Sequence, residues 1–539
     1  MAKLFLLPFL CCLVSASLFD SLEERILEKT MPKAASTQAP MVPQPKSFSM
    51  GQQTISLSSG FKFMPSSQSN TLTAAIARYM ALIFTHSSAS DLTDLPQLES
   101  VSISINSSDE TLQLDTDESY TLNVEASTRE AAMGASISAK TVYGALRALE
   151  TFSQLVLYNF SSGQYEIHGV PLNIMDEPRF QYRGLLLDTS RHFEPLSALR
   201  RVVDSMSYAK LNVLHWHIVD SQSFPMQSQS YPKLWNGAYS AQERYSTQDL
   251  KDVVEYARMR GVRVMVEFDM PGHAGSWCVG YPQICPAPDC TQPLNPANNY
   301  TFELIEGLFK EMTGGSKGMG IFTEDFFHLG GDEVNTACWQ KSPEIMNWMK
   351  QNNFTTTDEV YMYFVEKAHG IASKFGRTPV NWEEVFNHFG SKLDKSSIIH
   401  VWLNHATAAK IVAAGYRCIL SNSDVWYLDH LTITWQQFYD NDPHMGITDP
   451  KQQQLLIGGE VCMWGETVDP SDIDQTIWPR AAAAAERLWS PANVTDHDMM
   501  ESRLHAFRCL LDRRGIAAAP LDNKSARSAP PGPGGCYVQ

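Results

Sequence analysis

Eight short apolar runs follow one another between residues 183 and 466, and each ends in polar, acidic or aromatic residues. The runs are RGLLLDTSR, NVLHWHIVD, RVMVEFDMPGH, FFHLGGDE, TPVNWEE, SIIHVWLN, CILSNSDVWYL and LLIGGEVCMWGE. Helical patterns separate most of them, and apolar strands that alternate with helices are typical of a parallel sheet. Eight such units in about 300 residues favour a closed (β/α)8 TIM barrel. An open doubly wound sheet is the alternative, but no glycine-rich phosphate loop follows the first run.

The carboxyl ends of barrel strands are where barrel enzymes build their active sites. Asp332 and Glu333 follow the fourth run and the Gly330 and Gly331 pair. Neighbouring side chains of a regular strand point to opposite faces, but two glycines can break this alternation and bring both acids to the barrel mouth. One acid could instead cap the next helix or pair with an arginine. Close carboxylates push their pKa values apart, which favours a general acid beside a charged partner.

Aromatic and charged side chains end the other runs. Four aromatic residues close the fifth to eighth runs: Trp382, Trp402, Tyr427 and Trp464. The fold would gather their flat apolar faces around one pocket, which suits a sugar ring or a small apolar group. Core packing is the alternative for any single tryptophan, but it explains four corresponding positions poorly. Arg191, Asp220 and Glu466 could hold hydroxyl groups, although each alone could be a structural ion pair.

A metal site is a weaker interpretation of the strand ends. Strand alternation places His215 and His217 on one face, as in some zinc hydrolases. A catalytic zinc takes three protein ligands, and the other strand ends offer only His273 as a further histidine. We therefore expect structural histidines, no metal and no cofactor. The formal charge of −17, with 42 Lys and Arg against 59 Asp and Glu, also argues against a nucleic-acid partner.

Composition divides the chain into four parts. Residues 1–17 hold a lysine, a short apolar run and small residues, which predicts a cleaved signal peptide. Residues 18–48 predict a leader or linker, because residues 30–48 are rich in Pro, Ser, Thr and Gln. Residues 49–178 combine alternating strand patterns with a helical stripe of Val142, Leu146 and Leu149, which predicts a small α+β domain. Residues 179–539 hold the barrel and a C-terminal tail, with no stretch apolar enough for a membrane span.

Two further features suit a secretory route. Six N-x-S/T tripeptides are candidate glycosylation sites: Asn106, Asn159, Asn299, Asn353, Asn493 and Asn523. Six cysteines are disulfide candidates: Cys278, Cys285, Cys290, Cys338, Cys509 and Cys536. The first three crowd one Pro-rich loop, and the last two bracket the tail, but the pairing stays open. Zinc is the alternative, and no CxxC pair accompanies them.

Eight motifs, in chain order over residues 180 to 490, resemble family 20 glycoside hydrolases of the lysosomal β-N-acetylhexosaminidase type. They are RGLLLDTSRHF, KLNVLHWHIVD, EFDMPGH, HLGGDEV, NWEEVF, WYLD, GGEVCMWGE and WPRAAAAAERLW, and GALRALETFSQLV extends the likeness into the small domain. The resemblance implies an exo-acting hydrolase that removes terminal β-linked GlcNAc or GalNAc from glycans. It also implies a lysosomal or secreted location and a homodimer, since relatives dimerise.

The resemblance implies a retaining mechanism without a protein nucleophile, in which the substrate's own 2-acetamido oxygen attacks the anomeric carbon and forms an oxazolinium intermediate. Glu333 would protonate the leaving oxygen and later activate water. Asp332 would hold the acetamido N–H, and Tyr427 the acetamido oxygen. The other implied roles are a methyl box of Trp382, Trp402 and Trp464, hydroxyl contacts from Arg191 and Glu466, and support of the general acid by Asp220 and His273.

The sequence departs from the family pattern at three places. Ser221 stands where relatives usually carry a second Asp after Asp220, and the small domain has no cysteine for the bridge of animal relatives. Asp429 and His430 stand where relatives that accept charged sugars carry an Asn-Arg pair. Asp429 would face the 6-position of the sugar, and two charges ~4 Å apart interact by ~1–4 kcal/mol. We therefore expect a preference for neutral sugars.

Other functions stay open on the sequence alone. A catalytically silent relative would bind sugars without turning them over. A conventional retaining glycosidase would use Asp332 as its nucleophile. A metal hydrolase would lose activity with chelators.

Overall fold

A computed structural model of the protein describes residues 41–87, 94–126, 134–315 and 320–521. The predicted signal peptide, most of the predicted leader, Asn523 and Cys536 lie outside these ranges. Among the helices of the described ranges, none is long and apolar enough to cross a membrane.

Eight parallel strands close the barrel and confirm the predicted fold class. They are β7 (Tyr182–Asp188), β8 (Val213–Val219), β9 (Arg263–Phe268), β10 (Phe326–His328), β11 (Thr378–Trp382), β12 (Ile398–Val401), β13 (Arg417–Leu420) and β14 (Leu456–Met463). The pairing of β14 with β7 and of β9 with β10 closes the ring. Because helices cover the outside, the strands are buried almost along their whole length, which explains their apolar runs.

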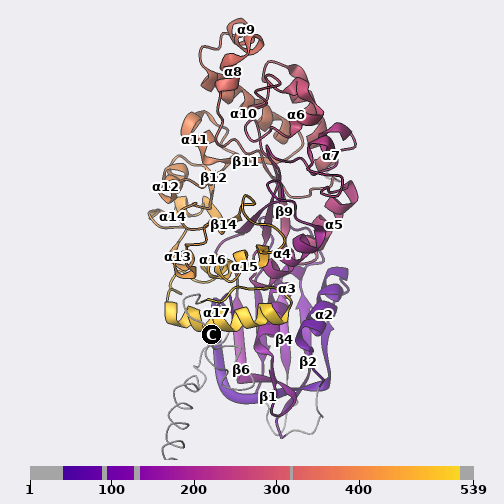
Figure 1. The fold of residues 1–539 in the computed structure, drawn as a ribbon. Coiled ribbons are helices and arrows are strands. Elements are labelled where there is room, and N and C mark those ends of the chain that lie inside the picture. The colour runs from indigo at the N-terminus through magenta and orange to yellow at the C-terminus, as the bar shows by residue number, and fades with distance from the viewer. Residues whose placement is uncertain (1–40, 88–93, 127–133, 316–319, 522–539) are drawn as a thin grey trace, which may run out of the picture.

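Helices surround the barrel in Figure 1. The longer ones are α4 (Leu196–Tyr208), α5 (Thr247–Arg258), α7 (Asn299–Thr313), α9 (Pro343–Gln351), α10 (Thr357–Lys374), α12 (His405–Ala413) and α16 (Arg480–Trp489). Shorter helices in the strand connections include α6 (Trp277–Gly280), α8 (Ala337–Lys341), α11 (Glu383–Phe389), α13 (Trp435–Asp440), α14 (Pro450–Gln453) and α15 (Ile473–Ile477). Their apolar faces and the outward faces of the strands form one large hydrophobic core.

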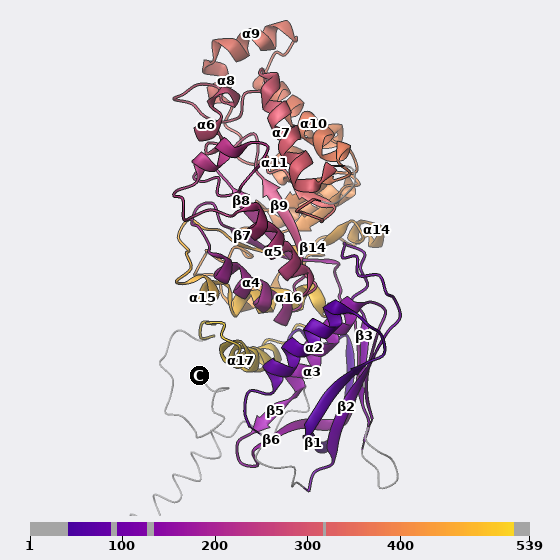
Figure 2. The same cartoon turned by 90° about the vertical axis from the view of Figure 1, so that its right-hand side faces the viewer.

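A smaller α+β domain precedes the barrel, as predicted. Its strands β1 (Ser47–Pro65), β2 (Gln97–Ile105), β3 (Tyr120–Val124), β4 (Ala135–Ala139), β5 (Leu157–Asn159) and β6 (Gln164–Asp176) form one sheet in the order β1-β2-β4-β3-β6-β5. The alternation predicted for SVSISIN and YTLNV is present, since buried and more exposed residues alternate along much of β2 and all of β3. Helices α2 (Asn70–Ile83) and α3 (Val142–Leu155) lie between this sheet and the barrel in Figure 2.

Helix α3 differs from its predicted form. The sequence indicates one apolar stripe, but every residue of α3 is buried, because the sheet covers one side and the barrel the other. Its charged residues therefore pair inside the interface. Arg147 lies 2.7 Å from Glu118 and donates to the carbonyl of Gly261 in the barrel at 2.6 Å. Glu150 pairs at 2.9 Å with Arg514, just after α17 (His497–Arg513).

Disulfides join Cys278 to Cys285 and Cys290 to Cys338, which resolves the pairing that the sequence left open for these four. Of the two candidate cysteines that bracket the tail, Cys509 is described and Cys536 lies outside the described residues. Four of the candidate glycosylation sites are exposed: Asn106, Asn299, Asn353 and Asn493. Asn159 is half-buried, and its amide donates to Glu166 at 2.9 Å.

Candidate active site

A cavity of about 240 Å³ opens at the carboxyl ends of the barrel strands. It is lined by Arg191, His273, Asp332, Glu333, Trp382, Trp402, Tyr427, Asp429, His430, Trp464 and Glu466. Sequence analysis proposed all of these except His430 as site residues. Asp220, the remaining proposed residue, is fully buried behind the cavity and reaches it through contacts with Arg191 and His273.

The two adjacent acids lie in a loop, not at the end of a strand as predicted. Strand β10 ends at His328, and a turn with positive φ at Gly330 (67°) and Gly331 (95°) precedes the acids. A Cβ at Gly330 would lie 1.7 Å from Oδ1 of Asp269, which also accepts the Gly331 N–H at 3.1 Å. The φ of Glu333 is also positive, at 48°. This turn breaks the strand alternation, so both acids line one cavity.

Asp332 and Glu333 differ in exposure. The side chain of Asp332 is 13 % exposed and that of Glu333 is 62 % exposed. Oδ1 of Asp332 is buried and has no hydrogen-bond partner within the described ranges, so it is free to accept one from a bound ligand. Nε2 of His273 lies 3.5 Å from Asp332 and 3.4 Å from Glu333. One acid therefore reaches toward solvent, and the other points into the cavity wall.

A charged network supports the acids from behind. Asp220 faces His273 Nδ1 at 3.2 Å and Arg191 at 2.8 Å, and Arg191 also pairs with Asp188 at 3.0 Å. Burial alone would lower the pKa of His273, but the charges of Asp332, Asp269 and Asp220 raise it to about 11. Burial alone would raise the pKa of Asp220, but hydrogen bonds from His217 and His273 hold it well below its ordinary range. The site thus keeps a cationic histidine beside both acids.

Aromatic rings form the cavity walls. The Trp382 and Trp464 ring centroids are 6.0 Å apart, and Trp402 lies nearly parallel to Tyr427 at 6.3 Å and 15°. The prediction that Tyr427 closes its strand is wrong, because β13 ends at Leu420 and Tyr427 follows seven residues later. A backbone bridge to Cys462 of β14 returns this segment to the barrel mouth. The four rings surround a space for a small apolar group.

Three further acids near the cavity were not predicted from the sequence: Asp269 and Glu267, which are buried, and Glu384, which is half-buried. Asp269 lies beneath the glycine turn, and burial and the charge of Asp332 raise its pKa well above the ordinary value. Glu384 accepts a hydrogen bond from the Trp402 indole at 2.9 Å, and burial and Asp332 raise its pKa to about 7. Glu267 accepts from the Trp382 indole at 2.9 Å. A carboxylate inside an otherwise apolar strand pattern was the available signal for Glu267.

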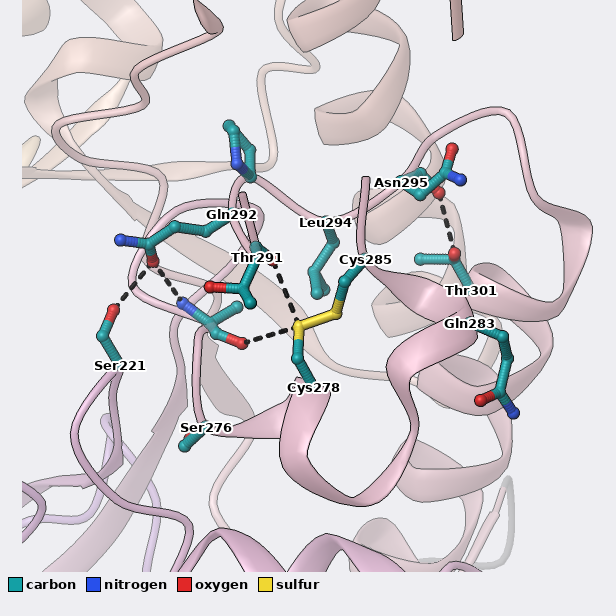
Figure 3. The surroundings of a disulfide bond; sticks show 12 residues. Ser221, Ser276, Cys278, Gln283, Cys285, Thr291, Gln292, Leu294, Asn295 and Thr301 are labelled. Atoms are coloured by element: carbon teal, nitrogen blue, oxygen red, sulfur yellow. Dashed lines mark hydrogen bonds between the residues drawn. A yellow bond between two sulfur atoms is a disulfide. The ribbon is translucent and has the colours of Figure 1, made fainter. Parts of the chain in front are cut away.

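The loop after β9, shown in Figure 3, is closed on itself by a disulfide and is joined to the site by hydrogen bonds to Gln292. Cys278 and Cys285 are joined there, and Ser221 donates to Gln292 Oε1 at 2.7 Å. The same oxygen accepts the backbone N–H of Ala274, next to His273, at 3.1 Å. The serine that replaces the expected acid therefore connects the loop after β8 to the loop that carries His273.

Asp429 lies at the cavity rim with a side chain 20 % exposed. Its Oδ1 is buried and has no hydrogen-bond partner in the part of the chain that the structure describes. His430 Nε2 lies 3.8 Å away. Burial raises the pKa of Asp429, and His430 opposes this rise. The rim therefore offers a carboxylate oxygen to a polar group of a ligand.

The two histidines considered as metal ligands are buried inside the barrel. His215 lies 2.8 Å from Glu460 and 2.9 Å from Glu267. His217 lies 2.6 Å from Glu267 and 2.8 Å from Asp220. Each ring nitrogen thus faces a carboxylate, as in a structural ion pair.

Comparisons with known proteins show the family to which the chain is similar. Residues 180–492 match the family described as "Glycosyl hydrolase family 20, catalytic domain", and residues 41–155 match "beta-acetyl hexosaminidase like". The chain is 47% identical over 525 residues to Beta-hexosaminidase 1 of Arabidopsis thaliana, with 94% of this chain and 96% of that protein covered. It is 41% identical over 422 residues to human Beta-hexosaminidase subunit beta, with 76% and 73% covered. Among solved structures, Flavobacterium johnsoniae chitobiase is similar, with a TM-score of 0.77, 29% identity, and 90% of this chain and 74% of that chain covered.

Proposed function

We propose, given that the chain belongs to glycosyl hydrolase family 20, that it is an exo-β-N-acetylhexosaminidase. It would remove terminal, non-reducing, β-linked GlcNAc or GalNAc from glycans by a retaining mechanism in which the substrate's acetamido group attacks the anomeric carbon. Two names among the similar proteins, beta-hexosaminidase and chitobiase, support this activity.

The observation that carries the proposal is the position of Asp332. Its unpartnered oxygen is buried in the same cavity as three tryptophans and Tyr427. A carboxylate oxygen accepts N–H groups, and a box of aromatic rings fits a methyl group, so the two together match an acetamido substituent. Both acids also meet at Nε2 of His273, at 3.5 and 3.4 Å, whereas a conventional acid and nucleophile pair flanks the glycosidic bond. Asp332 therefore orients the substituent rather than attacking carbon one.

Glu333 is the general acid and base in this proposal. Its exposed carboxyl protonates the leaving oxygen and then activates a water molecule, a role worth ~10²–10⁴ in rate. Asp332 holds the acetamido N–H, and Tyr427 holds the acetamido oxygen. The other roles are a methyl box of Trp382, Trp402 and Trp464, hydroxyl contacts from Arg191, Asp429 and Glu466, and alignment of His273 by Asp220.

A comparison of substrates tests the function. The protein should hydrolyse p-nitrophenyl β-N-acetylglucosaminide and leave p-nitrophenyl β-glucoside essentially intact, because the glucoside has no acetamido group to attack carbon one. A thiazoline analogue of the cyclic intermediate should inhibit, and EDTA should not. Equal cleavage of both glycosides would overturn the proposed mechanism, and no turnover of either would indicate a sugar-binding protein.

We also propose a secretory route to the lysosome or the exterior, a homodimer, and division into a small domain of residues 49–178 and a catalytic barrel with a tail over residues 179–539. The exposed N-x-S/T sites and the two disulfides support the route. Two separate hydrophobic cores support the division. A change in gel mobility after enzymatic removal of N-linked glycans tests the secretory route. Light scattering tests the homodimer, and limited proteolysis tests the division into two domains.

A further inference from the structure

The inward-facing residues of the barrel form layers, because alternate residues of each strand point toward the barrel axis. An apolar layer that includes Val213 and Met265 lies at the amino ends of the strands. Trp382 and Tyr427 belong to a layer at the carboxyl ends. Between them lies a layer of fully buried polar residues without a role in the proposed chemistry: His215, Glu267, His328, His400 and Glu460. Buried charges destabilise a fold unless each is well paired, so the pairing of this layer needs an explanation.

Glu267 of β9 is the centre of this layer. Its Oε1 accepts the indole N–H of Trp382 at 2.9 Å and lies 2.9 Å from Nδ1 of His328. Its Oε2 lies 2.6 Å from Nδ1 of His217 and 2.9 Å from Nε2 of His215. Groups from β8, β10 and β11 thus meet on one carboxylate. Burial alone would raise the pKa of Glu267, but these histidines hold it well below the ordinary value.

The first connection from Glu267 leads to the cavity floor. Trp382 is 1 % exposed, and its ring stacks on His400 with the centroids 4.3 Å apart. Its indole N–H is a buried donor, and Glu267 satisfies it. The bond fixes the rotation of the indole, so Glu267 determines which part of the ring faces the cavity.

The second connection leads to the charged network. Nε2 of His217 lies 2.8 Å from Asp220, which faces both His273 and Arg191. Burial alone would lower the pKa of His217, but Glu267 and Asp220 raise it to about 10. With both nitrogens protonated, His217 donates to a carboxylate on each side. The charged, acidic and aromatic groups that face it are Glu267, Asp220, Asp269, Asp188 and the Trp464 ring.

We propose that Glu267 is a positioning residue for the hydrolytic reaction: it orients Trp382 directly and, through His217, holds Asp220 where that carboxylate aligns Arg191 and His273. One buried carboxylate then couples the floor of the acetamido box to the support of the general acid. The inference rests on the proposed function, which supplies the roles of the two ends.

Glu267→Gln tests the coupling, and Glu460→Gln is its matched control. Glu460 is equally buried in the same layer and accepts from Tyr182 at 2.5 Å and from His215 at 2.8 Å, but neither residue belongs to the cavity. Glu267→Gln should lower kcat on p-nitrophenyl β-N-acetylglucosaminide by about 10- to 100-fold, the usual range for a supporting residue. Glu460→Gln should stay near wild type.

The pH profile gives a second readout that loss of packing would not produce. In Glu267→Gln, His217 loses the carboxylate that lies 2.6 Å from its Nδ1, one of the acids that face it, so its pKa falls toward the ordinary value of about 6.5. Its second proton then leaves within the assay range, and the alkaline limb of kcat/KM moves to lower pH. Wild type and Glu460→Gln should keep the limb in place. Equal losses in both variants, or an unmoved limb, would overturn the proposal.

Circular dichroism melts show whether Glu267→Gln folds. If it does not, Trp382→Phe and His217→Gln remove the two connections separately while Glu267 stays. Trp382→Phe keeps a ring and loses the N–H, so it should relax the preference for N-acetyl over N-propanoyl substrates without moving the alkaline limb. His217→Gln should lower kcat and keep that preference. Wild-type behaviour of both variants would overturn the proposal.

Ligand affinity separates this inference from the function on which it rests. If wild type hydrolyses neither glycoside, the proposed function fails. Titration calorimetry with GlcNAc-thiazoline then compares wild type with Glu267→Gln, and weaker binding by the variant alone still supports the positioning role. Equal binding by both proteins would overturn it.

Discussion

Asp332 and Glu333 are similar side chains in different surroundings, and the difference separates their roles. Asp332 is 13 % exposed beneath the aromatic walls, whereas Glu333 is 62 % exposed. Asp332→Asn should lower kcat/KM on aryl N-acetylglucosaminides by ~10²–10³ for every leaving group, since it removes charge stabilisation at the acetamido group. Glu333→Gln should spare substrates with acidic leaving groups, which need little protonation. Rates of both variants on phenyl and dinitrophenyl N-acetylglucosaminides test these roles. The same dependence of rate on the leaving group in both variants would contradict them.

Asp429 should set the preference for neutral sugars. A 6-sulfate ~4 Å from its carboxylate would be repelled by ~1–4 kcal/mol. Asp429→Asn removes this repulsion, so it should raise the ratio of turnover of sulfated to neutral substrates by about 10-fold or more. Glu466→Gln is the control, because it removes an acid from the same cavity whose side chain is 56 % exposed and therefore better screened. An unchanged ratio in Asp429→Asn would rule out charge repulsion at this position.

At the residue scale, side chains in a recognisable local pattern could be predicted, and those that depend on distant neighbours could not. The glycine pair drew attention to Asp332 and Glu333 in the sequence. Glu384 stands beside Glu383 in the same motif, and only the fold shows that Glu384 holds the Trp402 indole and lies near Asp332.

Among the structural elements, strands were predictable in number and order because burial on both faces leaves an apolar run in the sequence. The ends of the strands were not predictable, because a strand ends where its backbone stops hydrogen-bonding to the neighbouring strands. β10 ends at His328, where the Gly330 N–H turns back to the histidine ring at 3.1 Å. Tyr427 returns to the mouth through its bridge with Cys462, a contact far along the chain that no local pattern indicates.

The turn after β10 gives a prediction about backbone conformation. Gly331 has a φ of 95°, and a Cβ there would lie 2.8 Å from Val385, so Gly331→Ala should displace both acids and lower kcat strongly. Gly376 also has a positive φ, of 72°, but an added Cβ would have nothing within 4 Å. Gly376→Ala should therefore lower the free energy of unfolding by about 1 kcal/mol and leave kcat unchanged. Kinetics and thermal melts distinguish them, and equal effects on kcat would refute a specific role for the turn.

For the whole molecule, the contact between the two domains was the least predictable feature. Helix α3 has an ordinary amphipathic pattern, yet Arg147 and Arg183 meet on Glu118 in a buried cluster at 2.7 and 2.6 Å. Charged residues usually stay at the surface, so no local pattern predicts their burial. Breaking one partner of such a cluster leaves a buried charge unpaired, which makes the two domains interdependent.

Glu194, His217 and His273 have raised pKa values and lower the stability of the whole chain as pH rises from about 5 to 8, whereas buried histidines with lowered pKa values, such as His400, act in the opposite direction. Burial and the charge of Asp469 raise the pKa of Glu194 from 4.5 to about 8. Between these values the native state keeps a proton that the unfolded chain loses, so stability decreases with pH. His273 and His217 have pKa values raised to about 11 and 10, and they contribute stability that is complete below 6.5 and is lost above it.

Thermal melts of Glu194→Gln, measured between pH 5 and 8, isolate one of these groups. Glu194 is 1 % exposed, and its Oε2 has no hydrogen-bond partner within the described residues, so the neutral amide removes the cost of ionising a buried carboxyl. The melting temperature of the variant should fall less steeply with pH than that of wild type, and the two should converge near pH 5, where Glu194 of the unfolded chain also becomes protonated. Parallel curves would mean that Glu194 is ionised at neutral pH and that the histidines alone produce the pH dependence.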